Sequence, residues 1–280
     1  MRDISAADIR RTDSALVTFG TRHTLSDTLS DTRGIGAARR YLYTTFTTIS
    51  RGCGGCLRVE YDPAMMPLPR APGHPPVNVV NVLAWLPGRD TSRVVIVTGH
   101  YDSCRCAVDG MDSTSDAPGA DDDASGTSDV VELARVFSRR FPGGLGALYH
   151  PGLHILHVYR IDRIGRGTDH EPFVALGEPG IRTTERMEAL DRQHTPNDVF
   201  SHVDFSYSAK IARLNAAVLG AVGEAPGAPD SVRIQRIPPL GQQWRVTWAA
   251  EPGAVGYEVL LRGTASHTIG RRPGTMKSIP

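Results

Sequence analysis

Apolar residues recur every three or four positions in four stretches of the chain, which is the spacing of one helix face. The third stretch shows the pattern clearly, with Val130, Leu133 and Phe137 on one side. The stretches are residues 5–18, 35–49, 124–140 and 207–222. We expect the first two helices to pack outside a sheet and the other two to contribute a face to the core.

Shorter runs rich in β-branched residues alternate with these helices and predict strands. They lie at residues 57–61, 77–86, 93–98, 153–159 and 180–184. The run at 93–98 is almost entirely β-branched, as expected for a central parallel strand that is buried on both faces. Because strands and helices alternate, the sequence predicts an α/β fold with a doubly wound mixed sheet flanked by helices.

The pattern changes from Glu224, where an Ala-Pro-Gly-Ala-Pro linker precedes alternating strands at 232–236, 244–248 and 257–261. The segments Trp244-Arg-Val-Thr-Trp248, Pro252-Gly253 and Gly256-Tyr-Glu-Val259 resemble the first three strands of a fibronectin type III sandwich. A complete sandwich needs about seven strands. We therefore expect a main domain at 1–223, a short all-β, partial fibronectin type III-like fragment at 229–264, and a disordered tail at 265–280.

Composition fits this division. The chain has 280 residues and is 40% hydrophobic, enough for one α/β core and a smaller appendage. Its 31 Lys and Arg nearly balance its 30 Asp and Glu, and no basic stripe is present, which argues against nucleic acid and membrane partners. The longest apolar runs are strand-sized and the first residues are charged, so we expect a soluble chain without an export signal.

The four cysteines form two close pairs. Cys53-x-x-Cys56 can close a short disulfide loop, act as a redox pair or supply half of a zinc ribbon, and we favour the disulfide. A zinc site built from all four is disfavoured, because Cys104 and Cys106 are only two positions apart. Their redox state is left open.

Candidate chemistry begins at the end of the predicted strand 93–98, which runs into Gly99-His-Tyr-Asp-Ser103. His100 and Asp102 thus follow a buried strand, where open α/β sheets place their sites. A histidine can bind a metal through one ring nitrogen while a carboxylate fixes its tautomer. Alone, the pair is more often a satisfied contact at a strand end.

Three consecutive carboxylates, Asp121, Asp122 and Asp123, precede the helix predicted at 124–140. One aspartate suffices to cap a helix, whereas three adjacent anions repel one another unless a cation neutralises them. A divalent metal is the economical explanation.

These two blocks, Gly99–Ser103 and then Ala117-Pro-Gly-Ala-Asp-Asp-Asp-Ala-Ser-Gly126, resemble the M28 family of zinc exopeptidases in sequence and in order. Further matches lie at 34–39, 166–173 and 194–198, so the resemblance spans residues 1–223.

The resemblance implies a zinc-exopeptidase-like fold and a zinc-dependent aminopeptidase, a hydrolase whose substrate is a peptide with a free N-terminus. The resemblance implies that His100 and His194 bind zinc and that Asp122 bridges two zincs. It implies that Asp102, a catalytic-site residue, orients His100. It also implies that Asp169 and His170 line the substrate pocket. It also implies a cis peptide between Asp122 and Asp123, and a secreted or periplasmic location, although we leave localisation open.

The chain departs from the family pattern after about residue 142. The family site needs an adjacent Glu-Glu pair after the Asp-bearing helix and a later Asp ligand, and the sequence contains no adjacent Glu pair. We expect an internal deletion there, reflecting either true loss or an incomplete gene product. Each zinc of a two-metal site would keep only two protein ligands, whereas catalytic zinc normally has three. His100, Asp122 and His194 could instead surround one zinc, so we expect one zinc or none.

The leading functional hypothesis is thus an impaired aminopeptidase. The alternatives are a non-catalytic peptide-binding relative and an acyltransferase of the glutaminyl cyclase kind, which shares an Asp-His-x-Pro-Phe loop like residues 169–173. If the chain is active, Glu185 is the first candidate for the missing base. We interpret His23 and His202 as surface or capping residues.

Overall fold

The computed structural model describes residues 3–68, 71, 73–88, 94–140, 168–185, 188–227, 229–237, 243–254 and 256–257. The chain forms two compact units. The first comprises Met1–Leu153 and Gly167–Gly223, and the second comprises His154–Arg166 and Glu224–Pro280. The described residues mix helices and strands, consistent with an α/β fold. The tail predicted at 265–280 lies outside them.

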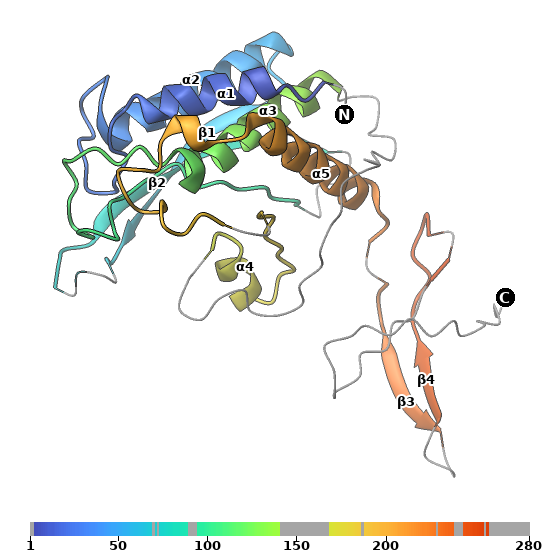
Figure 1. Cartoon of the computed structure of the whole chain (residues 1–280). Helices are drawn as coiled ribbons and strands as arrows, with labels where there is room; N and C mark the ends of the chain where they lie inside the picture. Colours follow the sequence, from blue (N-terminus) through green and yellow to red (C-terminus); the bar gives the residue numbers. More distant parts are fainter. Residues whose placement is uncertain are drawn as a thin grey trace. The chain divides into compact units, whose positions relative to one another are not determined.

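All four predicted helices are present, as α1 (Ala6–Val17), α2 (Gly34–Gly52), α3 (Ser125–Arg140) and α5 (Phe205–Glu224) (Figure 1). Side chains cap two of their N-termini. The Ser5 hydroxyl accepts the Asp8 N–H at 3.2 Å to start α1, and the Asp204 carboxylate accepts the N–H groups of Ser206 and Tyr207 before α5.

Helix α3 lies between two apolar clusters and joins them. On one side Leu133 packs with Ile9 of α1 and Ala212 of α5. On the other side Val131 packs with Leu42 of α2 and other apolar residues of α1, α2 and the first hairpin. The predicted periodicity of α3 therefore marks two buried faces rather than one, and burial on both sides fixes the helix that follows the three aspartates.

The first unit contains one described hairpin, in which β1 (Arg58–Met66) pairs antiparallel with β2 (Val77–Trp85) and Arg58 lies opposite Trp85. The predicted strands at 57–61 and 77–86 are confirmed. Helix α2 packs on this hairpin through Phe46, which shares a cluster with Val59.

Two other strand predictions are wrong for the residues that the structure describes. Residues 94–98 and 180–184 form no strand, and the sheets seen in the described ranges are two-stranded antiparallel hairpins, not a doubly wound mixed sheet. Val94 and Ile96 are 63% and 55% exposed, so the β-branched run is not a buried central strand. Strand propensity cannot form a ladder without a neighbouring strand, and the predicted strand at 153–159 lies outside the described residues.

In the second unit, β3 (Arg233–Ile237) pairs antiparallel with β4 (Gln243–Thr247). Ile234 and Trp244 on this hairpin are 66% and 61% exposed. Most of the third predicted strand, at 257–261, lies outside the described residues, so the fibronectin-like fragment stays a prediction.

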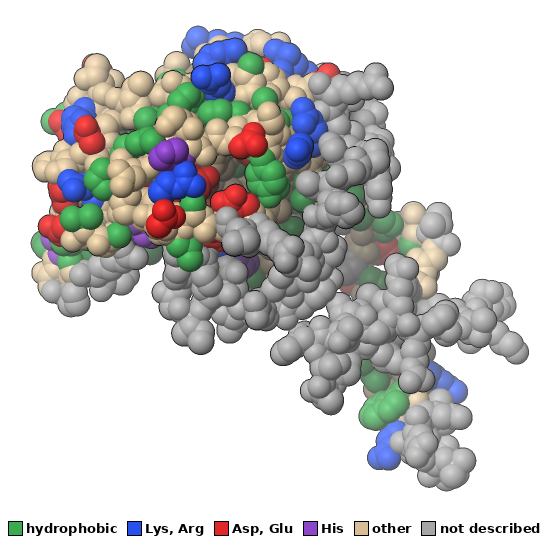
Figure 2. Space-filling view, viewed as in Figure 1, with side chains coloured by type: hydrophobic (Ala, Val, Ile, Leu, Met, Phe, Trp, Pro, Cys, Tyr) green, Lys and Arg blue, Asp and Glu red, His purple; other side chains and the backbone are tan. Residues whose placement is uncertain are grey.

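Both cysteine pairs form disulfides, Cys53–Cys56 and Cys104–Cys106, and no cysteine is free. The favoured interpretation of the first pair is confirmed, and a four-cysteine zinc site is ruled out. The face shown in Figure 2 carries both basic and acidic side chains. Within the part of the chain that the structure describes, no helix is long and apolar enough to cross a membrane.

Candidate metal centre

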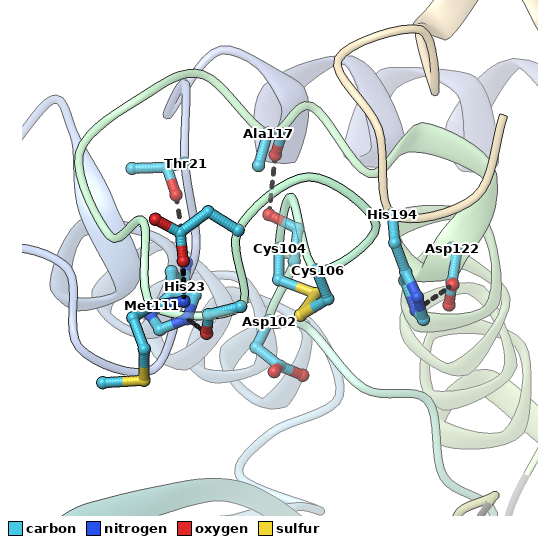
Figure 3. Close-up of a disulfide and its surroundings, with 12 residues drawn as sticks. Thr21, His23, Asp102, Cys104, Cys106, Met111, Ala117, Asp122 and His194 are labelled. Carbon is cyan, nitrogen blue, oxygen red and sulfur yellow. Dashed lines mark hydrogen bonds and ion pairs between the residues drawn. A yellow bond between two sulfur atoms is a disulfide. The ribbon is translucent and has the colours of Figure 1, made fainter. Parts of the chain in front are cut away.

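The structure brings His100, Asp122 and His194 together from three separate loops. His100 follows residues 94–98, Asp122 lies in the turn Ala120–Ala124 that leads into α3, and His194 precedes the short turn Phe200–His202. The His100 Nε2 atom lies 3.0 Å from Asp122 Oδ1, and the His194 Nε2 atom lies 3.0 Å from Asp122 Oδ2. Figure 3 shows the imidazole of His194 facing Asp122. Each oxygen of one carboxylate therefore contacts a different imidazole.

Asp102 contacts the other side of the His100 ring, with its Oδ1 atom 3.2 Å from Nδ1. A carboxylate at this position accepts the Nδ1 proton and leaves Nε2 directed at Asp122. This contact agrees with the orienting role that the resemblance implied, although the role itself stays a prediction.

Charge balance in this cluster depends on the same contacts. Burial tends to raise the pKa of Asp122, but hydrogen bonds from His100 and His194 outweigh it and hold that pKa well below its usual range. Burial tends to lower the pKa of His100, but hydrogen bonds to Asp102 and Asp122 hold it well above the usual value. These contacts favour the protonated imidazole, and a proton on Nε2 must leave before that atom can bind a metal.

Two further aspartates, Asp198 and Asp123, hold the backbone of the cluster through their carboxylates. The Asp198 carboxylate accepts the N–H of Asp121 at 2.7 Å and that of Asp122 at 3.0 Å. The Asp123 carboxylate accepts the N–H of His100 and that of Gly126, each at 3.0 Å. The sequence signal for Asp198 was its place in the matched block at 194–198, and the signal for Asp123 was the run of three aspartates before α3.

Backbone geometry around the cluster is unusual at two points. The Asp122–Asp123 peptide is cis, as the resemblance implied. His194 has a φ of 59°, in the left-handed region, and its carbonyl oxygen accepts the N–H of Ala107 at 3.2 Å. That bond joins the His194 loop to the segment just after the Cys104–Cys106 disulfide.

The two predicted substrate residues lie in the turn before the short helix α4 (Glu171–Ala175). Burial, the largest cause, raises the pKa of Asp123 to about 7, although the charge of His100 opposes the rise. Asp169 is close enough for its charge to help raise the same pKa. The ring of His170 contacts the Thr168 hydroxyl, and among the described residues no hydrogen bond or ion pair joins it to the three central residues.

Glu185 is within electrostatic range of the aspartate turn. Burial first, then Asp198 and Glu185, raise the pKa of Asp121 to about 6. In the described ranges, however, no hydrogen bond or ion pair joins Glu185 to the two imidazoles.

His23 was interpreted as a surface or capping residue, and the structure contradicts the surface position but shows a local contact of the capping kind. Its side chain is 7% exposed, and because Nδ1 accepts the Leu25 N–H at 3.0 Å, the Nε2–H group donates to the Gly110 carbonyl at 3.2 Å. His202 is exposed, as predicted.

The donor atoms suit zinc in type but not in number. Zinc binds histidine nitrogen and carboxylate oxygen at about 2.0 to 2.2 Å, so neighbouring tetrahedral ligands lie roughly 3.4 Å apart. The two 3.0 Å separations approach that value. Yet no group of three or more His, Cys, Asp and Glu side chains among the described residues is arranged to hold a metal ion. The cluster offers two pairs of donors that share Asp122.

The fold and this cluster define an α/β protein with a histidine and carboxylate centre of the kind found in metal-dependent hydrolases. A model of peptidase family M28 matches residues 81–145, which contain His100 and the aspartate turn. A probable zinc metalloprotease of Leptosphaeria maculans is 31% identical over 373 residues, covering 95% of this chain and 85% of the relative. Probable zinc metalloproteases of Pyrenophora teres f. teres and Pyricularia oryzae are 29% and 27% identical, covering 94% of this chain and 76% and 74% of their own lengths. The comparison with solved structures gave no significant match. The chain belongs to peptidase family M28.

Proposed function

We propose that this chain is a zinc-dependent aminopeptidase of the M28 type whose catalytic rate is reduced by loss of its acidic base. The observation that carries the proposal is the Asp122 carboxylate, with each of its oxygens 3.0 Å from a histidine nitrogen. Three relatives named as probable zinc metalloproteases support the choice of zinc and of peptide hydrolysis.

Each residue of the cluster has a part in this proposal. His100 and His194 would hold the metal through Nε2, Asp122 would hold it through its carboxylate, and Asp102 would keep the Nδ1 proton of His100. Zinc, when bound, polarises the scissile carbonyl as a Lewis acid. Asp169 and His170 line the substrate pocket, where a carboxylate is suited to the ammonium group of a free N-terminus.

The reduced rate follows from a segment that this chain lacks. The alignment to the Leptosphaeria maculans relative is 373 residues long, whereas the chain has 280, so part of the relative has no counterpart here. The family match ends at residue 145, close to the deletion predicted after about residue 142. A positioned general base contributes about a hundred to ten thousand-fold to a rate, and its removal lowers turnover by that factor.

A second candidate function is peptide binding without hydrolysis. It is favoured by one observation, that the described residues contain no group of three side chains able to hold a metal. In this alternative the loops survive as a recognition surface and the second unit, with its fibronectin-like hairpin, attaches the chain to a partner.

Native mass measurement of the full chain with added zinc tests the proposal. We expect one zinc ion per chain, lost in His100→Ala and retained in His202→Ala, which removes an exposed imidazole whose described contact is to the Asn197 carbonyl at 3.1 Å. A wild-type chain that takes up no zinc would overturn it.

Release of a chromophore from leucyl anilide separates the two functions. We expect slow, chelator-sensitive turnover, about a hundred to ten thousand-fold below the usual range of roughly 1 to 1000 per second. Zinc binding without turnover, combined with binding of unhydrolysed peptides, would favour the second candidate. Turnover in the usual range would show that a base remains, and Glu185→Gln is then the first variant to measure.

A further inference from the structure

Arg22, in the segment between α1 and α2, is a fully buried residue with 0% exposure. Its guanidinium donates four hydrogen bonds, all to backbone carbonyls. Nε donates to Tyr101 at 2.7 Å, Nη1 donates to Leu16 at 3.1 Å and to Pro118 at 2.6 Å, and Nη2 donates to Gly119 at 2.9 Å. One side chain therefore joins the end of α1 to both loops that carry the central histidine and aspartates.

The backbone of Arg22 makes the same connection a second time. Its N–H donates to the Ser103 hydroxyl at 3.1 Å, and its carbonyl accepts the Ser103 N–H at 3.3 Å. The Ser103 hydroxyl in turn donates to the Ala117 carbonyl at 2.7 Å. The segment that starts at His100 and the segment that leads to Asp122 are thus fixed to each other through this one residue.

Close packing at this junction leaves no room for a side chain at position 119. Gly119 has a φ of +53°, and a Cβ atom there would lie 2.5 Å from Ser103 Cβ and 3.1 Å from Arg22 Nη2. Only glycine lets the backbone approach the guanidinium so closely.

Burying a cation that bonds only to carbonyls carries a desolvation penalty in free energy. Burial lowers the pKa of Arg22 to about 10, while the carboxylates of Asp13, Asp102 and Asp198 oppose that fall. The group therefore stays charged at neutral pH, and its positive charge offsets the anionic groups that surround the cluster. A neutral side chain could supply packing, but not five fixed N–H donors together with this charge.

We propose that Arg22 is a positioning residue that sets the distance between the His100 loop and the Asp122 loop and thereby the zinc affinity of the cluster. The proposal rests on the proposed function, because it takes zinc as the ligand. Lysine at position 22 keeps the charge but places its three donors on one nitrogen, so it cannot span the four carbonyls that the planar guanidinium reaches.

The test compares full-length Arg22→Lys with Arg135→Lys. Arg135 is a matched control, because it is a partly buried arginine on α3 that is bonded to Glu132, at 2.6 Å through Nε, and not to the metal loops. The zinc dissociation constant is measured by competition with a chromophoric chelator, and thermal unfolding is measured without metal. We expect Arg22→Lys to weaken zinc binding by about 10 to 100-fold, while Arg135→Lys lowers thermal stability and leaves zinc affinity unchanged.

Hydrogen exchange of the metal-free chain provides a readout that does not depend on zinc. We expect Arg22→Lys to speed exchange in residues 100–103 and 117–123 and to leave α5 unchanged. If the wild type binds no zinc, the proposed function fails, while this measurement still decides whether Arg22 joins the loops. Should Arg22→Lys not fold, Ser103→Ala is the milder variant, and a smaller loss of affinity in the same direction is expected. Unchanged zinc affinity in a folded variant would overturn the proposal, as would unchanged exchange in both loops.

Discussion

Replacing Asp198 with asparagine removes one of the two oxygens that accept hydrogen bonds from the aspartate turn and leaves the size of the side chain almost unchanged. The side chain is 2% exposed, and its two oxygens accept the N–H groups of Asp121 and Asp122 at 2.7 and 3.0 Å. The Asp198 backbone carbonyl also accepts the Ala120 N–H at 3.2 Å. In Asp198→Asn one oxygen becomes an NH₂ group that faces a backbone N–H donor.

The cost can be worked out from these contacts. A hydrogen bond to a charged group contributes about 1.5 to 3 kcal/mol, and a buried donor left without an acceptor costs about 1 to 3 kcal/mol. The shorter bond, to Asp121, is expected to keep the amide oxygen, so the N–H of Asp122 loses its acceptor. We therefore expect Asp198→Asn to lower the free energy of unfolding by about 2 to 3 kcal/mol. We also expect it to weaken zinc binding by roughly tenfold, because outer contacts of this kind orient metal ligands.

Urea unfolding of the full chain at pH 8, with zinc titration of the folded variant, measures both quantities. Asp191→Asn is the control, since Asp191 is exposed on the same loop and its loss of charge should change either quantity little. A stability loss below about 0.5 kcal/mol, the range of ordinary surface substitutions, would refute the reasoning, as would unchanged zinc affinity.

Two further predictions concern other carboxylates. Asp102→Asn removes the acceptor of the His100 Nδ1 proton, so zinc affinity should fall by about 10 to 100-fold in chelator competition; an affinity equal to wild type would contradict an orienting role. Asp13 is fully buried with neither oxygen hydrogen-bonded among the described residues, and burial raises its pKa to about 8 despite the opposing charge of Arg22. The folded chain thus keeps a proton that the unfolded chain releases near pH 4, so the stability this group contributes is lost as pH rises towards 8. Urea unfolding at pH 5 and at pH 8 measures how much free energy of unfolding each chain loses between the two pH values. We expect Asp13→Asn to lose less than the wild type, by a few kcal/mol at most. Equal losses in the two chains would disprove this prediction.

Features that depend on nearby residues were predictable from the sequence. The four helices follow from apolar periodicity, and the Ser5 cap of α1 lies three residues from its donor. The cluster of His100, Asp122 and His194 was found because each residue lies in a short motif.

Features that depend on distant partners were not predictable. The role of Asp198 is defined by N–H groups 76 and 77 positions away, and that of Arg22 by a carbonyl 97 positions away. The run at 94–98 has the residue types of a central strand, but propensity alone does not supply the neighbours that a ladder requires.

The left-handed backbone of His194 separates the shape of its loop from the chemistry of its side chain. Asparagine and glycine adopt this conformation readily, whereas a β-branched residue there costs on the order of 1 kcal/mol or more. A change from histidine to asparagine would therefore remove the imidazole and keep the loop, while a change to valine would disturb both. Among related chains, asparagine at position 194 would therefore indicate a protein that has kept the loop conformation and lost the imidazole.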